Sequence, residues 1–207
     1  MMRYLFFVAA VLFSLTISGP AKAHPHVWAD IRVQVEFNDE GLVTGLRQTW
    51  LFDDFYSAFV IGGGVGQAAL DAVLAENMSS LREYDYFTRI LSGEARIDDA
   101  KAEDASSRIV DKRLEMSFWL ALPEPLSVAD LPMRYAVYDP SYYIEMVHAE
   151  APGAVTLVNA PKNCTSELKQ PNPDAEQVIL AASLDNTQKA PTGLGQYFAE
   201  EVTVKCG

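Results

Sequence analysis

Basic residues are scarce in this sequence. Its 207 residues include 16 Lys and Arg against 28 Asp and Glu, a formal net charge of −12. Removing residues 1–23 takes away Arg3 and Lys22 but no acidic residue, which leaves 14 basic against 28 acidic residues and a charge of −14. Because nucleic acids and anionic lipid surfaces attract positive charge, this balance argues against both as partners. It is compatible with attracting cations, and also with simple solubility.

Long apolar runs are missing after the first 23 residues. Residues 1–23 have the three parts of a secretory signal: Arg3, an apolar core at 4–17, and the small residues Ala21 and Ala23 at the positions that a signal peptidase reads. The core is shorter than the roughly 20 residues that span a bilayer. We therefore expect a signal peptide at 1–23, cleaved after Ala23, and a single exported α+β domain at 24–207 without a transmembrane span of its own.

Signatures of catalysis are also absent. The sequence has no Gly-x-Ser-x-Gly elbow, no His-Glu-x-x-His and no reactive cysteine context, and Ser57 and Ser141 have no adjacent base. We therefore expect a protein that is not an enzyme.

Only two cysteines occur, Cys164 and Cys206. In an oxidising compartment such a pair usually forms a disulfide. We expect this bridge to tie the last strand to a loop and to contribute roughly 2–4 kcal/mol. The alternative is that the two thiolates bind a metal ion.

Alternating apolar and polar residues indicate a β-rich fold that begins with a hairpin. Apolar side chains occupy every second position at 27–37. At 42–52 one face of the expected strand carries Leu42, Leu46, Trp50 and Phe52 together with Thr44 and Gln48, and the turn-forming residues 38–41 separate the two runs. Further strands are expected at 95–105, 109–122, 131–138, 155–159 and 198–206, with a turn at Ser106 and Ser107. Helices are expected from 67 to about 91 and at 174–183, the second with Val178, Ile179 and Ala182 pointing inward, and a loop is expected at 162–173. The predicted class is α+β: antiparallel sheet starting with an N-terminal hairpin, a helical insertion after it, a short C-terminal helix and a closing strand.

Two of the three histidines, His24 and His26, stand immediately after the predicted cleavage site. Residues two apart in an extended chain point to the same face, so both imidazoles are expected to converge on one ion, with Pro25 stiffening the approach. Cleavage would add the free amine of His24. An amine and an imidazole from one residue suit copper, nickel or zinc. Pro25 has no amide proton, which excludes the square-planar form that uses deprotonated backbone amides.

Other side chains are candidates to complete this metal site. They are the third histidine and nearby carboxylates: His148, Asp53, Asp54, Asp139, Glu145 and Glu150. A packed or surface role is the alternative for His148. Two other functions remain open: a copper oxidoreductase that uses an N-terminal histidine, and a non-metal interaction domain whose aromatic residues dock a membrane partner.

Three motifs carry a family resemblance: His-Pro-His-Val-Trp at 24–28, the segment at 50–59 that begins Trp-Leu-Phe-Asp-Asp, and Tyr-Asp-Pro-Ser-Tyr-Tyr at 138–143. With these motifs, nearly the whole chain after residue 23 resembles a bacterial family of unknown function. Its members are named as the periplasmic component of an uncharacterised ABC-type transport system, and they are often encoded beside nickel/cobalt permeases. The resemblance implies a periplasmic location and an accessory role in transporting nickel or cobalt, and the histidine pair adds zinc as a candidate ion. It also implies an inner-membrane metal permease or an ABC-type transporter as partner.

Overall fold

The computed structural model of the protein describes residues 24–62, 66–184, 190–191 and 193–207. The expected signal peptide at 1–23 lies outside this part. Eleven strands are described: β1 Val27–Phe37, β2 Val43–Phe52, β3 Thr88–Ser92, β4 Ala95–Ile97, β5 Lys101–Val110, β6 Arg113–Leu126, β7 Met133–Val137, β8 Ile144–His148, β9 Val155–Val158, β10 Cys164–Lys169 and β11 Glu201–Cys206. The helices are α2 Asp54–Gly62, α3 Gln67–Arg82, α4 Ala175–Ser183 and the 3₁₀ turns η1 Asp85–Phe87 and η2 Leu194–Phe198.

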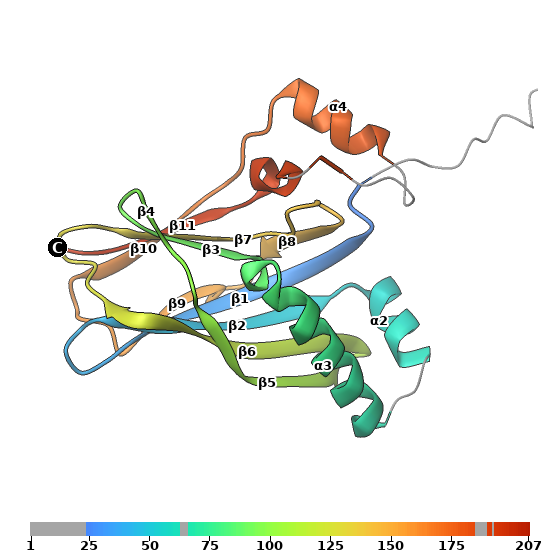
Figure 1. The fold of residues 1–207 in the computed structure, drawn as a ribbon, viewed down its shortest axis with the longest axis horizontal. Coiled ribbons are helices and arrows are strands. Elements are labelled where there is room, and N and C mark those ends of the chain that lie inside the picture. The colour runs from blue at the N-terminus through green and yellow to red at the C-terminus, as the bar shows by residue number, and fades with distance from the viewer. Residues whose placement is uncertain (1–23, 63–65, 185–189, 192) are drawn as a thin grey trace, which may run out of the picture.

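The strands form two sheets, and the α+β prediction is confirmed. Sheet A has the order β5-β6-β2-β1-β8, and β9 also pairs with β1. Sheet B has the order β10-β11-β7-β3-β4. Most pairs are antiparallel, but β8 and β9 both run parallel to β1. Figure 1 shows the start of β1, α2 and α4 at one end of the molecule and the C-terminus at the other.

The predicted N-terminal hairpin is confirmed, and it supplies much of the core. Every second side chain of β1, from Val27 to Phe37, is buried. These side chains join inward-facing residues of sheet B, such as Tyr135 and Val202, in one hydrophobic cluster. Each fully buried aliphatic or aromatic side chain contributes about 1.5–3 kcal/mol. The two sheets are therefore held together by their apolar inner faces.

In β2 the buried face changes near its start. The sequence pattern places Leu42 and Thr44 inward, but Val43 is buried and Thr44 is only half-buried. The reason is a register irregularity against β6 between Val43 and Gly45. A Cβ atom at Gly45 would lie 2.5 Å from the carbonyl oxygen of Leu120, so only glycine fits this close approach.

Three predicted boundaries are wrong. The helix expected to reach about residue 91 ends at Arg82, because Asp85, Tyr86 and Phe87 take left-handed backbone angles and the chain then enters β3. The expected turn at 106–107 lies within β5, and the chain reverses at Asp111 and Lys112 instead. The expected loop at 162–173 contains β10, an exposed edge strand. The residues of β10 are polar and show no apolar alternation, so the sequence does not indicate a strand. The strand forms because it pairs with β11.

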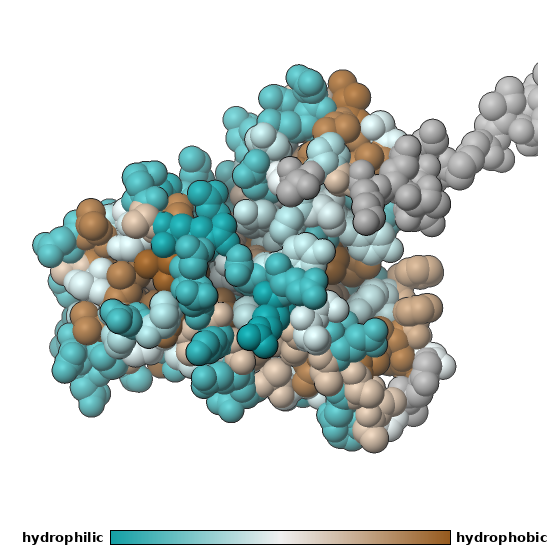
Figure 2. Space-filling view, viewed as in Figure 1, coloured by the Kyte–Doolittle hydropathy of each residue, from teal (hydrophilic) through white to brown (hydrophobic). Residues whose placement is uncertain are grey.

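The C-terminal helix is confirmed, but the face it buries differs from the expected one. Asp174 caps α4 through a hydrogen bond from the N–H of Gln177. Val178 and Ile179, expected to point inward, are 48% and 68% exposed. Ala181 and Leu184 are buried instead, in a small cluster with Tyr142 and Leu194. Figure 2 shows the hydrophobic residues over α4 standing out from the surrounding hydrophilic surface.

Within the described residues, no single helix has the length and apolarity needed to cross a membrane. Taken together, α2 and α3 are long and apolar enough by composition, but their axes are bent by 117° relative to each other.

Candidate metal centre

Three parts of the fold fix the backbone of the segment from His24 to Trp28. The N–H of His24 donates to the carbonyl oxygen of Ala181 at the end of α4, at 3.2 Å. The N–H of His26 donates to the carbonyl oxygen of Tyr143, just before β8, at 2.9 Å. The N–H of Trp28 donates to Oδ2 of Asp53, at the end of β2, also at 2.9 Å. The segment is therefore an ordered entry into β1.

The imidazoles of His24 and His26 lie together, as the sequence predicts. Their ring centroids are 4.7 Å apart and the ring planes meet at 72°. The backbone route differs from the expected extended strand, because β1 begins only at Val27 and the peptide bond between His24 and Pro25 is cis. His24 is buried. Nε2 of His26 is also buried, and it has no hydrogen-bond partner among the described residues. Such a nitrogen is suited to a metal ion.

The ring of Tyr143 packs against both imidazoles, and Tyr143 is not among the site residues expected from the sequence. Its ring centroid lies 5.1 Å from that of His26 and 5.9 Å from that of His24. The parallel register of β1 and β8 pairs Val27 with Ile144, so the residues that precede these two, His26 and Tyr143, also lie side by side. This long-range pairing leaves no local signal in the sequence.

Asp53, Asp54 and Asp139 are placed less favourably as ligands. Asp53 Oδ1 accepts the N–H groups of Phe55 and Tyr56 and so caps α2, while its Oδ2 holds Trp28. Asp54 is exposed in the first turn of α2.

The Asp139 carboxylate is buried and accepts hydrogen bonds from Ser141 and from the N–H of Ile144. Glu145 accepts a hydrogen bond from the hydroxyl of Tyr142, and Glu150 is exposed. The carboxylates of Asp53 and Asp139 thus organise backbone turns beside the two histidines.

His148 lies away from the pair, in a buried network of its own. It pairs with Ile31 in the register of β1 and β8, four residues beyond Val27, which corresponds to about 13 Å along the strand. Its Nδ1 is 2.8 Å from Oε2 of Glu200, and its Nε2 is 3.5 Å from the hydroxyl of Tyr135. The structure therefore does not bring His148 together with His24 and His26.

Glu200 is the charged member of this buried network, and it was not singled out from the sequence. Burial of its carboxylate opposes ionisation, but hydrogen bonds from the ring and backbone N–H of His148 and from Gln170 outweigh burial and lower its pKa. Burial raises the pKa of the neighbouring Tyr135 hydroxyl, which stays neutral. The network joins β8 of sheet A to β7 of sheet B and to Glu200, the residue just before β11.

In the part of the chain that the structure describes, no three His, Cys, Asp or Glu side chains are grouped to hold a metal ion. A metal ion bound by the two imidazoles of His24 and His26 would therefore need further ligands. Cys164 and Cys206 do not supply them, because they form the predicted disulfide across β10 and β11.

Comparison with known proteins gives a family without an assigned activity. Residues 9–206 match the family described as "Protein of unknown function (DUF1007)". An uncharacterised protein of Haemophilus influenzae is 28% identical, over 95% of this chain and 98% of its own length. The family match extends over nearly the whole sequence, including His24, His26 and Tyr143. The chain therefore belongs to the DUF1007 family of proteins of unknown function.

Proposed function

We propose that the protein is a periplasmic accessory protein that binds a divalent transition-metal ion, nickel, cobalt or zinc, through His24 and His26. The observation that carries this proposal is the pair of imidazoles with centroids 4.7 Å apart, one of which buries a nitrogen that lacks a hydrogen-bond partner among the described residues. Imidazole nitrogens are good ligands for these ions and for copper.

The spacing of the rings fits one shared ion. A ligating imidazole nitrogen lies about 2.0–2.1 Å from zinc, which puts the ring centroid roughly 3.2 Å from the ion. Two centroids separated by 4.7 Å then subtend an angle of about 95° at that ion. This angle lies between the octahedral and tetrahedral values, so the spacing of the two rings is compatible with both imidazoles binding the same ion.

An ion held by few protein ligands exchanges readily, and this suits a carrier. The resemblance to components of transport systems supports an inner-membrane metal permease or ABC-type transporter as the partner. The Cys164–Cys206 disulfide supports an oxidising compartment such as the periplasm. After cleavage following Ala23, the amine of His24 would become a third nitrogen ligand.

The test is titration calorimetry with nickel, cobalt, zinc and copper, on protein exported with its native leader. Mass spectrometry would first establish that the mature chain starts at His24. We expect saturable, one-to-one binding of at least one ion, lost in the double variant His24→Ala, His26→Ala and weakened when one extra residue precedes His24. The matched control is His148→Asn, which should bind with unchanged affinity. Absence of binding to all four ions would refute the proposal.

Exposed aromatic residues favour a second candidate, an interaction domain without a metal. Phe55 and Phe59 stand one turn apart on α2 and are 84% and 79% exposed. Such apolar exposure marks surfaces that contact other molecules. Metal content unchanged by the double histidine variant would favour this candidate. A copper oxidoreductase would instead show redox turnover when loaded with copper and none with zinc.

A further inference from the structure

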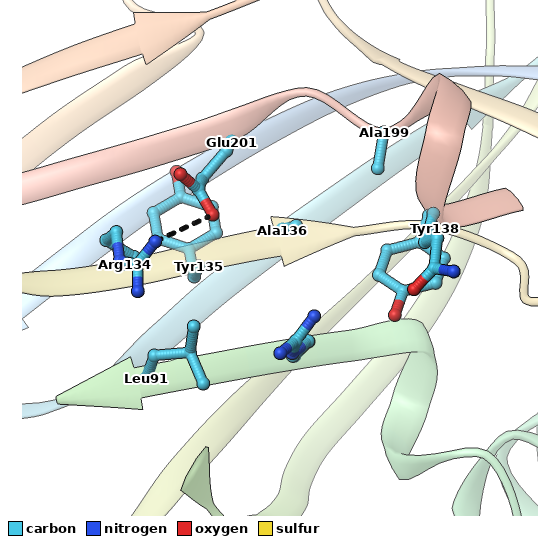
Figure 3. Close-up of a pocket in the computed structure, with 9 residues that line it drawn as sticks. Leu91, Arg134, Tyr135, Ala136, Tyr138, Ala199 and Glu201 are labelled. Atoms are coloured by element: carbon cyan, nitrogen blue, oxygen red, sulfur yellow. Dashed lines mark ion pairs between the residues drawn. The ribbon is translucent and has the colours of Figure 1, made fainter. Parts of the chain in front are cut away.

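A small pocket lies on sheet B, apart from the histidine pair. Strands β3, β7 and β11 and the 3₁₀ turn η2 line it, and its volume is ≈ 80 Å³. Ala136 pairs directly with Arg89 on one side and with Glu201 on the other. Figure 3 shows the pair of Arg134 and Glu201 at one end, Tyr138 at the other, and Ala136 between them. The short side chain of Ala136 leaves room for the hollow between its longer neighbours.

The pocket carries an excess of positive charge in an acidic protein. Two guanidinium groups, of Arg89 and Arg134, line it together with one carboxylate, of Glu201, so the lining residues sum to +1 in a chain of −12. Arg134 is already engaged by Glu94 at 2.9 Å and by Glu201 at 3.7 Å. Arg89 has no carboxylate within ion-pair distance in the described part of the chain, although acidic residues outnumber basic ones.

Two neutral hydrogen-bonding groups complete the lining. The hydroxyl of Tyr138 and the side-chain amide of Gln196 both line the pocket. Neither side chain makes a hydrogen bond to another residue that the structure describes. The guanidinium of Arg89 and these two groups therefore all have donors to offer to an incoming acceptor.

We propose that this pocket binds a carboxylate group. A guanidinium and a carboxylate make paired, charge-assisted hydrogen bonds, and one negative charge neutralises the excess of +1. Ligand pockets for drug-sized molecules enclose about 300–1,000 Å³, so a pocket of ≈ 80 Å³ takes a group of a few atoms. The carboxylate is either that of a free short-chain acid or that of an acidic side chain on a polypeptide. This proposal does not depend on metal binding by His24 and His26.

The experiment is a titration of ¹⁵N-labelled protein with sodium acetate, followed by the backbone amide resonances, against sodium chloride at equal ionic strength. We expect saturable shifts at Arg89, Ala136 and Gln196 with acetate only. Arg89→Gln, which removes the unpaired cation, and Ala136→Leu, which fills the hollow, should each abolish them. Arg82→Gln, at an exposed arginine outside the pocket, is the matched control and should leave them unchanged.

Two further probes decide the class and the source of the ligand. Inorganic phosphate that saturates the same shifts at lower concentration than acetate would overturn the assignment to carboxylates, as would shifts that persist in Arg89→Gln. Aspartate blocked at both ends presents a side-chain carboxylate within a peptide-like frame. Tighter binding of blocked aspartate than of acetate would assign the pocket to a polypeptide, and the reverse order would assign it to a free acid.

Discussion

His26 and Tyr143 touch twice, once through the backbone and once through their rings. The N–H of His26 donates to the carbonyl oxygen of Tyr143 at 2.9 Å, and the ring centroids are 5.1 Å apart. The first contact fixes where β1 begins relative to β8, and the second limits the rotation of the imidazole. Tyr143 is therefore a positioning residue for the proposed metal centre.

Replacing Tyr143 by alanine should weaken metal binding by roughly 2- to 10-fold, because an aromatic contact contributes about 0.5–1.5 kcal/mol. Tyr143→Phe keeps the ring and should retain the affinity of the parent protein. Calorimetric titration of both variants measures the difference. An equal loss in both would instead identify the hydroxyl of Tyr143 as a ligand.

The buried carboxylate of Glu200 should make stability depend on pH. Its pKa is lowered in the folded protein, so its contribution is present above the unfolded value of about 4.3 and is lost as the pH falls through the folded value. At pH 7 we expect Glu200→Gln to reduce the free energy of unfolding by roughly 1–3 kcal/mol. Urea unfolding from pH 7 to pH 3 should show the two proteins converging at the acid end. A difference that stays constant with pH would contradict this account.

Removing the disulfide should destabilise the protein. The bridge closes a loop with a sequence separation of 42, for which the loss of chain entropy predicts roughly 4 kcal/mol. The double variant Cys164→Ser, Cys206→Ser should therefore unfold at lower urea concentration than the oxidised protein. Reduction of the parent protein provides the control, since it should produce the same shift. Amide exchange should also become faster in β10, the edge strand that the bridge holds to β11.

Replacing Gly45 should destabilise the protein. A Cβ atom there would lie 2.5 Å from the carbonyl oxygen of Leu120 and as close to the ring of Trp119. Gly45→Ala should cost about 1–3 kcal/mol through overpacking. The control is Gly62→Ala, where a Cβ atom would meet nothing within 4 Å. Thermal unfolding of the two variants should show a lower transition temperature for the first only.

Sequence reasoning reached those parts of the fold that depend on neighbours in the chain. The alternation in β1 and β2, the turn that begins at Asn38 and the helix expected at 174–183 are all local patterns, and each appears in the structure. The strand β10 was not predicted because its residues are polar and exposed. The parallel pairing of β1 with β8 was not predicted because it joins residues more than 100 positions apart.

In the candidate site, too, the sequence predicts contacts between residues close in the chain but not contacts between distant residues. His24 and His26 are two positions apart, and their rings lie close together although the backbone between them is not the expected extended strand. Tyr143 reaches them only through the pairing of β1 with β8, and His148 is kept from them by the same register. Glu200 meets His148 across 52 positions of sequence. Such contacts depend on tertiary packing, which leaves no periodic signal along the chain.

The disulfide and the histidine pair lie at opposite ends of the molecule. Cys206 is next to the C-terminus at one end in Figure 1, and the start of β1 lies at the other. The covalent bond therefore stabilises the far edge of sheet B. The histidines are held instead by hydrogen bonds that their own N–H groups donate to the carbonyl oxygens of Ala181 and Tyr143. A reductant would accordingly loosen the disulfide end first and leave the end with the proposed metal site in place. The covalent cross-link and the proposed metal site thus lie at opposite ends of the long axis, so breaking one need not disturb the other.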